Sequence, residues 1–500
     1  MNIFRAAPTV FLALAWLVSG TSVAEEDPKL DSKAQQKSPT AFADDKPRPV
    51  LDWGVGEGQS YWVPAADIFL FDLGLNLLNR SISGTDDYDV TGGSIQKNFG
   101  GKWVHDSDPF GVNQFGHPYQ GSMYHGFARS AGLGYWTAAG YTILGSAAWE
   151  VAGETTAPSL NDQFTTGFGG SFLGEPLFRM ASLLLESGEP GGPRFWREFG
   201  AAALSPATAF NCKFYGDRFD GVFRSYNPAV YTRMALGYTV ASHVSSNVTD
   251  PNGVVVPQTY KKGEVVGDFT LGYGMPGKPG YTYKRPFDYF HFQFTAASNS
   301  VFENIMSRGL VYGSDYAWGD SYRGVWGLYG SYDYIAPQIF RISTTAASLG
   351  TTGQAWLSPK FALQGTVLAG VGYGSAGTIG GVGLRDYHSG VTPQGLLALR
   401  LIYSDRMSLD LTARDYHVTD MVSDEPGGKE NIFRADTQLT LRVYNLHSIT
   451  LKYVGSRRDA HYVGLPDTRQ DVGSFSIGYA YLGQTRSGAV DWRPKRDGGP

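Results

Sequence analysis

Cysteine is almost absent from this chain, because Cys212 is the only one among 500 residues. A single cysteine excludes an internal disulfide framework and any metal site built from several cysteines. Charged residues make up only 17% of the chain, and the net charge is -5. A weakly acidic chain of this kind offers no electrostatic attraction to nucleic acid. We therefore expect no nucleic-acid partner.

Several motifs of known catalytic sites are also missing. The chain has no GxSxG nucleophile elbow, no Walker phosphate loop, no HExxH helix and no paired CxxC motif. Aromatic residues and glycine are plentiful instead, with 65 Gly, 30 Tyr, 29 Phe and 11 Trp. This profile is typical of membrane β-barrels, which carry aromatic girdles.

The N-terminus has the parts of a secretory signal peptide. Met1–Arg5 is short and basic, Ala6–Val18 is apolar but short for a bilayer span, and Ser22-Val23-Ala24 supplies a small-x-small cleavage pattern. We expect cleavage after residue 24. Residues 25–50 are charged, bear prolines and are poor in large apolar side chains, which predicts a disordered periplasmic leader.

Residues 221–483 show a clear alternating pattern. In Val230–Val240, large apolar side chains alternate with Arg233, Thr239 and small residues. The same alternation returns over 290–295, 407–414, 433–443 and 448–453. One face suits lipid and the other a polar interior.

The fold class follows from this pattern. Segments of about ten residues, the length of a tilted membrane-spanning strand, recur roughly twelve times. We predict a mainly β fold, an antiparallel transmembrane β-barrel of roughly 12 strands, with ten to fourteen as the range. A soluble β-sandwich is the alternative, but charges gather on one face of each strand while aromatics and leucines occupy the other. Residues 484–500 form a polar tail where many such barrels end on an aromatic residue.

Residues 51–220 do not alternate, and we predict an N-terminal helical domain packed in or under the barrel lumen. Residues 131–149 carry no charge, yet their glycines and tyrosines make them only moderately apolar, so burial inside the barrel or against its periplasmic mouth is favoured over a membrane span. Ionisable residues stand out against this background. Glu150 and Glu154 share a face if the helix continues, and Pro158-Ser159 resembles a helix N-cap.

Three interpretations of these ionisable residues stay open. In the first, Glu175 pairs with Arg179, and Glu150 or Glu154 pairs with Arg129, so that a polar network locks the helices together. In the second, a histidine with clustered carboxylates forms a metal or acid/base site. In the third, the same residues line a polar path or a lipid-headgroup site. The candidates for catalysis are His117, Glu150, Glu154 and Asp162, and those for a binding or structural network are His125, Arg129, Asn161, Glu175 and Arg179. The sequence does not decide whether a metal or cofactor binds.

An ordered set of motifs resembles a bacterial envelope family known as domain of unknown function 3943. The motifs are His117-Pro118-Tyr119-Gln120-Gly121, Ala128-Arg129-Ser130, Gly145-Ser146 with Trp149-Glu150 and Glu154, Pro158-Ser159-Leu160-Asn161-Asp162, and Gly169-Gly170 with Leu173-Gly174-Glu175 and Arg179. The resemblance covers roughly a hundred residues. It implies an outer-membrane location and supplies no activity.

These observations lead to a ranked set of functions. We expect an outer-membrane barrel with a role in envelope lipid or cell-surface homeostasis, whose helical domain is a plug or a lipid-contacting site. One alternative is a hydrolase or acyltransferase of lipid A or phospholipid that uses His117, Glu150 and Glu154. Another is a gated channel for a small solute. The expected partners are outer-membrane lipid and, during insertion, the barrel-assembly machinery.

Overall fold

A computed structural model describes residues 50–51, 59–106, 108–186, 194–215, 222–249, 254–256, 258–298, 300–378, 387–420, 427–464 and 466–492. The predicted signal peptide at 1–24 and almost all of the predicted leader at 25–50 lie outside these residues. The polar tail is described as far as Trp492.

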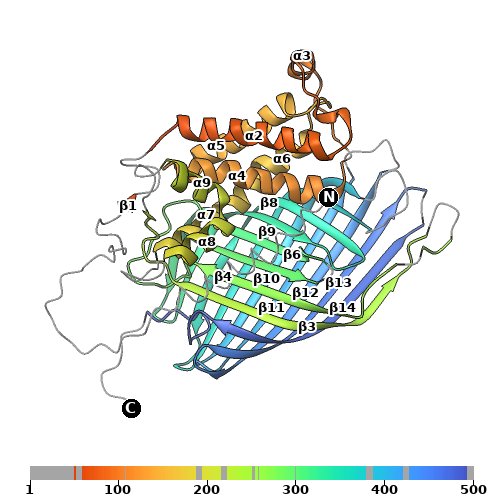
Figure 1. The fold of residues 1–500 in the computed structure, drawn as a ribbon. Helices are drawn as coiled ribbons and strands as arrows, with labels where there is room; N and C mark the ends of the chain where they lie inside the picture. The colour runs from red at the N-terminus through yellow and green to blue at the C-terminus, as the bar shows by residue number, and fades with distance from the viewer. Residues whose placement is uncertain are drawn as a thin grey trace.

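Within the described residues, twelve strands form a closed antiparallel barrel, in which each strand pairs with the next and β14 pairs back with β3 (Figure 1). The strands are β3 (Val230–Ser246), β4 (Gly263–Tyr273), β5 (Phe290–Ala297), β6 (Asn304–Trp318), β7 (Tyr322–Ile335), β8 (Phe340–Trp356), β9 (Phe361–Thr378), β10 (His388–Tyr403), β11 (Met407–Thr419), β12 (Gly428–Tyr444), β13 (His447–Tyr462) and β14 (Thr468–Leu482). The predicted barrel and its strand number are confirmed. Closure leaves no unpaired sheet edge.

The two faces of the strands have the predicted character. On β3, Leu236, Tyr238 and Val240 are exposed on the outside of the barrel, whereas Arg233 and Thr239 are buried in the lumen. Such a large exposed apolar wall is unfavourable in water and suits lipid. The register carries this alternation from strand to strand, so that outward Tyr238 lies opposite outward Val265 of β4.

The two ends of the barrel differ. The turn end carries short connections at 319–321, 357–360, 404–406 and 445–446, together with the longer 274–289 segment between β4 and β5. The loop end carries the other connections, at 247–262, 298–303, 336–339, 379–387, 420–427 and 463–467. The predicted tight turn after β12 is present, and Asn445 adopts a positive φ of 48° there, which asparagine tolerates better than most residues.

The N-terminal region is helical, with a short parallel pair of β1 (Val50–Leu51) and β2 (Val222–Phe223) beside it. Its helices are α2 (Trp62–Ile82), α3 (Gly92–Gly100), α4 (His117–Ser130), α5 (Tyr135–Ala152), α6 (Leu160–Phe164), α7 (Gly170–Glu186), α8 (Arg194–Leu204) and α9 (Pro206–Phe214), with a 3-10 turn η2 (Asp86–Tyr88) and π-helical turns η3 (Val112–Gly116) and η4 (Thr165–Gly169). Among the described residues, no helix is both long enough and apolar enough to cross a bilayer. The uncharged stretch 131–149 instead supplies most of α5.

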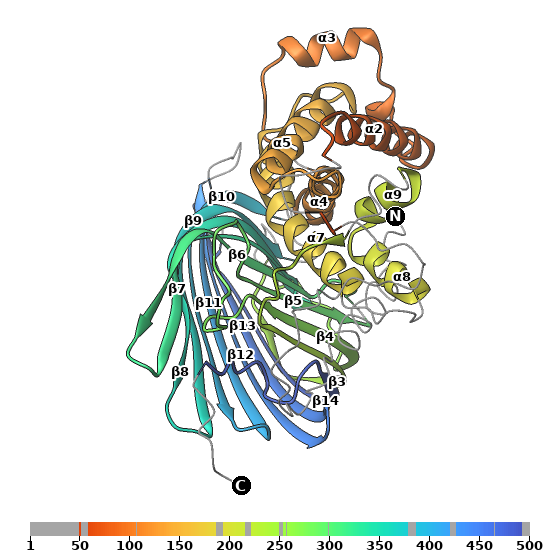
Figure 2. The same ribbon diagram turned by 90° about the vertical axis from the view of Figure 1, so that its left-hand side faces the viewer.

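The helical domain lies against the outer wall of the barrel, whereas the sequence predicted a position in or under the lumen (Figure 2). The contacts reach outward-facing side chains of the strands. Ser307 Oγ donates a hydrogen bond to the carbonyl oxygen of Phe172 at 2.6 Å, and Tyr332 Oη donates to the carbonyl oxygen of Gln114 at 2.5 Å. On β7, Tyr332 alternates with inward Asp333, so this contact is outside the barrel.

The hydrophobic effect explains this position. The outer face of β4–β7 is rich in aromatic and aliphatic side chains, and these are buried against α7 and its neighbours. The shared core contains Leu173, Met180, Leu184, Phe269, Leu271, Phe290, Phe292, Phe294 and Ile305. The lumen is instead lined largely by polar and charged side chains, so most of the apolar partners that the helices need lie on the outside of the wall.

Candidate functional site

The carboxylate cluster begins where α5 ends and α6 starts. The predicted N-cap is confirmed, because Ser159 Oγ accepts a hydrogen bond from the backbone N–H of Asp162 at 3.2 Å. Glu150 Oε2 accepts from the backbone N–H of Ser159 at 2.7 Å. The start of α6 is therefore tied to the last turn of α5 through a buried carboxyl group.

Asn161 joins the other acidic residues. Its Nδ2 donates to Asp106 Oδ1 at 3.0 Å and to Asp162 Oδ1 at 3.1 Å. His117 Nε2 lies 3.7 Å from Asp162 Oδ2, which is too far for a direct hydrogen bond, and its Nδ1 lies 3.2 Å from Thr166 Oγ1. The structure thus brings predicted His117, Glu150, Asn161 and Asp162 to one region.

Glu154 takes a different position from the one predicted. Because α5 ends at Ala152, Glu154 does not share a helical face with Glu150. It leaves the helix and accepts hydrogen bonds from Trp149 Nε1 at 2.9 Å and from Thr156 Oγ1 at 3.0 Å. Glu154 therefore lies at the rim of the cluster.

Asp106 and Asn113 belong to the cluster, but the sequence did not indicate them. Asp106 sits in a loop without periodic pattern, and Asn113 Nδ2 donates to its Oδ1 at 2.5 Å. Asn113 also reaches Tyr387 Oη at 3.0 Å, and Tyr387 donates to the carbonyl oxygen of Asp108 at 2.6 Å. Only folding brings Tyr387, which precedes β10, to this loop, and no local signal in the sequence marks the contact.

Burial sets the protonation of the cluster. Burial, with the nearby charges of Glu154 and Asp106, raises the pKa of Glu150 to about 8, although the Ser159 N–H partly offsets this. Burial and the hydrogen bond with Asp106 raise the pKa of Asp162 well above its usual range. Burial lowers the pKa of His117. Burial therefore favours the uncharged forms of Glu150, Asp162 and His117, as expected where buried charges have no compensating partner.

Access limits what the cluster can do chemically. His117 is 6% exposed, Glu150 4% and Asp162 2%. A general acid or base needs to touch its substrate directly or through one water molecule, and these groups are enclosed by protein. Among the described residues, no three His, Cys, Asp or Glu side chains are arranged to hold a metal ion. The geometry is that of a buried polar junction between helices.

A second cluster surrounds Glu175 on α7. Its carboxylate accepts from Arg129 Nε at 2.8 Å and from Arg179 Nε at 2.8 Å, and it contacts His125 Nε2 at 2.9 Å. The predicted pairing of Glu175 with Arg179 is present. The predicted pairing of Arg129 with Glu150 or Glu154 is wrong, because α4 and α7 pack together and place Arg129 beside Glu175 instead.

The Glu175 cluster also connects the helices to the barrel. Arg179 Nη1 lies 3.2 Å from Asp288 Oδ1, and its Nη2 donates to the carbonyl oxygen of Pro286 at 2.6 Å. Both partners belong to the segment between β4 and β5. Although burial alone would raise the pKa of Glu175, Arg129 and Arg179 hold it well below its usual range.

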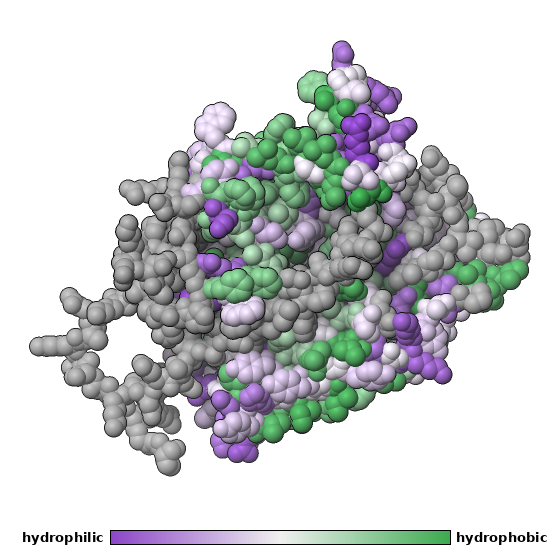
Figure 3. All heavy atoms as spheres, in the orientation of Figure 1, coloured by the Kyte–Doolittle hydropathy of each residue, from purple (hydrophilic) through white to green (hydrophobic). Residues whose placement is uncertain are grey.

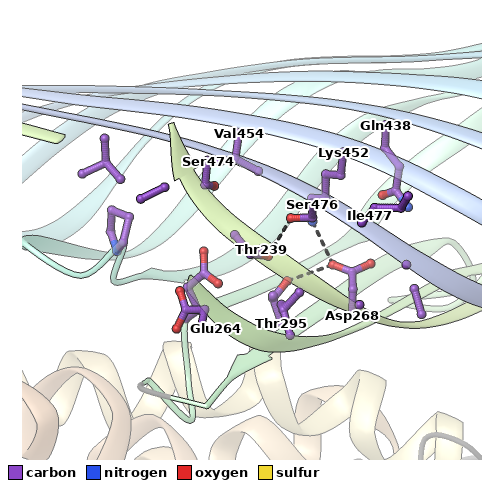
Figure 4. A pocket seen from close by; sticks show the side chains of 18 of the residues that line it. Thr239, Glu264, Asp268, Thr295, Gln438, Lys452, Val454, Ser474, Ser476 and Ile477 are labelled. Atoms are coloured by element: carbon purple, nitrogen blue, oxygen red, sulfur yellow. Dashed lines mark hydrogen bonds and ion pairs between the residues drawn. The ribbon is translucent and has the colours of Figure 1, made fainter. Parts of the chain in front are cut away.

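The lumen is crossed by side chains from opposite strands. Arg233 Nη1 of β3 lies 2.7 Å from Asp410 Oδ2 of β11, and Arg414 Nη2, also on β11, donates to Asn304 Oδ1 of β6 at 3.0 Å. Two cavities lie in the part of the lumen that the described residues form. One is lined mainly by β3, β4 and β12–β14 (Figure 4), and the other mainly by β5–β11.

Both ends of the lumen are obstructed. At the loop end, an apolar cluster fills the interior with Ile335, Ile339, Phe340, Ile342, Tyr416, Val418 and Ile432. At the turn end, the C-terminal segment 483–492 lies in the mouth. Gln364 Nε2 donates to the carbonyl oxygen of Gly488 at 2.7 Å, and Gln354 bonds to both the N–H of Val490 at 2.9 Å and its carbonyl oxygen at 2.6 Å. Gln354 and Gln364 face inward, so the tail enters the barrel.

Comparisons with known proteins agree with the motif resemblance. Residues 102–207 match the family model described as "Domain of unknown function (DUF3943)". This segment runs from the loop before η3 to the start of α9 and includes both charged clusters of the helical domain. The comparison with curated proteins yields no match.

Solved structures similar to the chain include outer-membrane channels. A deltaS2 mutant of the monoaromatic hydrocarbon channel TodX shares 9% identity over 52% of this chain and 91% of its own, with a TM-score of 0.24. A Pseudomonas aeruginosa FadL homologue shares 9% identity over 52% and 90%, with a TM-score of 0.21. The channel DcaP of Acinetobacter baumannii shares 8% over 51% and 96%, with a TM-score of 0.22. Because these identities and TM-scores are low, the barrel assignment rests on the strand pairing of this chain and not on the similar structures.

Proposed function

We propose that the protein is an outer-membrane channel for a small polar solute, closed in the described state by its own C-terminal segment. The observation that carries this proposal is a polar lumen with two cavities inside a barrel whose mouth holds the C-terminal segment of the chain. A barrel without a transport role could fill its interior with apolar side chains, as small barrels do. Here the walls of the cavities carry many hydroxyl, amide and charged groups.

Several features support the outer membrane as the location. The secretory signal predicted at 1–24 directs export, and a closed barrel satisfies all backbone hydrogen bonds of a membrane span internally. Outward side chains such as Val367, Leu397 and Ile477 are exposed around the barrel. Insertion by the barrel-assembly machinery belongs to the same proposal.

Deleting residues 484–500 tests the channel. We expect the truncated barrel to conduct more than the full-length protein in planar bilayers, because the hydrogen bonds of Gln354 and Gln364 to the tail are lost. The matched control deletes only 493–500, which leaves Gly488, Val490 and Trp492 in the mouth. Equal conductance of the two truncated proteins and the full-length protein would remove the channel proposal.

A lipid-contacting role is a second candidate, because the helical domain exposes large apolar side chains. Trp62 is 85% exposed and Phe69 67% exposed on α2, and Phe195 on α8 is 65% exposed. Figure 3 shows apolar residues gathered over α2 at the top of the molecule. Exposed apolar surface of this extent marks a site for lipid or a partner. Such a surface supports a role in envelope lipid homeostasis.

Lipid mass spectrometry separates the second candidate from the channel. Total envelope lipids, including lipid A, are compared between a strain lacking the gene and strains that carry wild-type, Glu150→Gln or Trp62→Glu/Phe69→Glu protein. A mass change restored by wild type but not by Glu150→Gln would favour the lipid-enzyme alternative. If only the Trp62→Glu/Phe69→Glu variant fails to restore the wild-type lipid masses, lipid contact by α2 is favoured. If the lipid masses do not change when the gene is absent, the channel is the better proposal.

A further inference from the structure

We propose that the lumenal cavity between β3, β4 and β12–β14 binds an uncharged, hydroxyl-bearing solute of the sugar class. This inference rests on the proposed channel function and names its solute. We call this cavity the hydroxyl cavity. It is lined by hydroxyl side chains from four strands, namely Thr239, Thr295, Thr450, Ser456, Ser474 and Ser476.

The hydroxyl groups are placed to exchange hydrogen bonds with a solute. Thr239 Oγ1 and Ser476 Oγ lie 2.6 Å apart on neighbouring strands, and Thr295 Oγ1 donates to Asp268 Oδ2 at 2.9 Å (Figure 4). A hydroxyl can donate and accept, and it rotates to suit its partner. A wall of hydroxyls therefore matches a polyol, whose groups also do both.

The charges around the hydroxyl cavity are paired with one another. Lys452 Nζ lies 2.9 Å from Asp268 Oδ2, and Arg434 Nη2 lies 3.8 Å from Glu303 Oε1. The three cationic lining residues Lys261, Arg434 and Lys452 equal in number the three acidic ones, Glu264, Asp268 and Glu303. A charged solute would have to compete with a pair already formed, whereas an uncharged polar solute would leave the pairs intact.

The lining also differs from that of the second cavity. Tyr289 and Tyr329 line the second cavity, together with Met306 of β6. Among the described residues that line the hydroxyl cavity, none has an aromatic side chain. An apolar or aromatic solute would gain no hydrogen bonds from the hydroxyl groups that line the hydroxyl cavity.

A latch covers the hydroxyl cavity at the loop end. Gln338 Oε1 accepts from the backbone N–H of Lys261 at 2.8 Å, and its Nε2 donates to Glu264 Oε1 at 2.9 Å. These bonds tie the connection between β7 and β8 to that between β3 and β4. Gln338 has a φ of +69°, in the left-handed region, where a residue other than glycine is strained. Strain of this kind gathers at binding and switch sites, and here the two hydrogen bonds of Gln338 offset it.

Saturation-transfer NMR on the full-length protein in detergent tests this site without requiring conduction. The probes are glucose, succinate and putrescine, which are neutral, anionic and cationic. We expect binding of glucose only, weakened about tenfold in Thr239→Val and in Ser476→Ala, because each loses a hydrogen bond to the solute. Thr352→Val is the matched control, because Thr352 belongs to a hydroxyl pair with Thr366 at the second cavity.

The outcomes separate the site from the channel. Tighter binding of succinate or putrescine than of glucose, or glucose binding unchanged in both Thr239→Val and Ser476→Ala, overturns the site. Variants are compared only after heat-modifiable mobility shows a folded barrel, and Ser474→Ala is a third variant if one fails to fold. If deletion of the tail raises conductance but the protein does not bind glucose, the channel proposal stands and the proposed solute site is wrong. If the protein binds glucose but deletion of the tail does not raise conductance, the solute site stands and the channel proposal is wrong.

Discussion

At the residue scale, the helical domain buries charge in two ways. Glu175 is compensated by two guanidinium groups and a histidine, and its pKa is held low. Glu150 faces other carboxylates, and burial raises its pKa to about 8. The Glu175 cluster is an ionic junction, whereas the Glu150 cluster contains no arginine or lysine among the contacts described above and is held together by hydrogen bonds of Ser159 and Asn161 to carboxyl groups. The two clusters therefore respond differently to mutation and to pH.

Glu175→Gln should strongly destabilise the helical domain. The substitution removes the carboxylate that Arg129 and Arg179 both contact, and breaking a buried pair from one side costs about 3–5 kcal/mol. Urea titration followed by tryptophan fluorescence measures the free energy of unfolding. Glu154→Gln is the control at the rim of the other cluster, where we expect a loss of about 1 kcal/mol or less. Equal losses in the two variants would contradict the ionic junction.

Glu150 should make stability fall as pH rises. Its pKa is raised on folding from an ordinary 4.5 to about 8, so the folded state holds a proton that the unfolded state releases in this range. Between about pH 4.5 and 8, a single group of this kind lowers the free energy of unfolding by up to about 1.4 kcal/mol per pH unit. Its stabilising effect is complete below the unfolded pKa and is lost as pH rises through the folded pKa.

Thermal unfolding of wild type and Glu150→Gln between pH 5 and 8 measures this effect. We expect Glu150→Gln to flatten the pH dependence and to exceed wild type in stability near pH 8. Asp86→Asn, at an exposed carboxylate on η2, should leave the wild-type slope unchanged. A slope that survives in Glu150→Gln would show that other groups dominate the titration.

At the scale of elements, α4 and α7 cross where glycine is required. A Cβ built on Gly121 would lie 2.0 Å from the carbonyl oxygen of Thr166, and one on Gly170 would lie 2.5 Å from the Cα of Gly121. This crossing brings Arg129 of α4 within reach of Glu175 of α7. On α5, a Cβ built on Gly145 would lie 3.0 Å from a side-chain atom of Ile68, a looser approach than the one at Gly121.

Gly121→Ala should therefore destabilise the helical domain. The added methyl group would overlap backbone atoms, and the helices would have to separate, at a cost of roughly 1–3 kcal/mol or more. Gly140→Ala on α5 is the control, because a Cβ there meets nothing within 4 Å. We expect that variant to gain about 0.5–1 kcal/mol from helix propensity. Thermal unfolding measures both, and a stable Gly121→Ala protein would refute the close crossing.

At the scale of the whole molecule, the barrel and the helical domain share an apolar interface outside the lumen. The lumen is obstructed by its own strands and by the C-terminal segment. Helices on the outer wall do not control the cross-section of the lumen. The helical domain and the lumen therefore lie on opposite sides of the barrel wall.

Deleting residues 59–215 should leave the conductance of the barrel unchanged in planar bilayers. The tail still closes the turn end in that variant, whereas deleting 484–500 should open it. The deletion should also uncover Phe269, Phe290 and Phe294, and we expect more lipid or detergent bound per barrel for that reason. A large rise in conductance on removal of the helices would contradict their position outside the lumen.

The sequence by itself determined the class of the barrel and several local features. A period of two places Leu236 outside and Arg233 inside, because successive side chains of a strand point to opposite faces. The N-cap at Ser159 and the pair of Glu175 with Arg179 are also local, since each depends on residues at most four positions apart. These features need no knowledge of the rest of the fold.

Only the tertiary structure decided which distant groups meet. Arg129 contacts Glu175 rather than Glu150 because the crossing of α4 and α7 sets their separation, and Asp106 joins Asn161 across 55 residues of chain. The helices lie outside the barrel because their apolar faces bury more apolar surface against the outer wall than they would in the polar lumen. Periodicity shows which face of a single strand or helix is apolar. Which apolar faces pack together depends on every surface of the molecule, so it is set only when the whole chain folds.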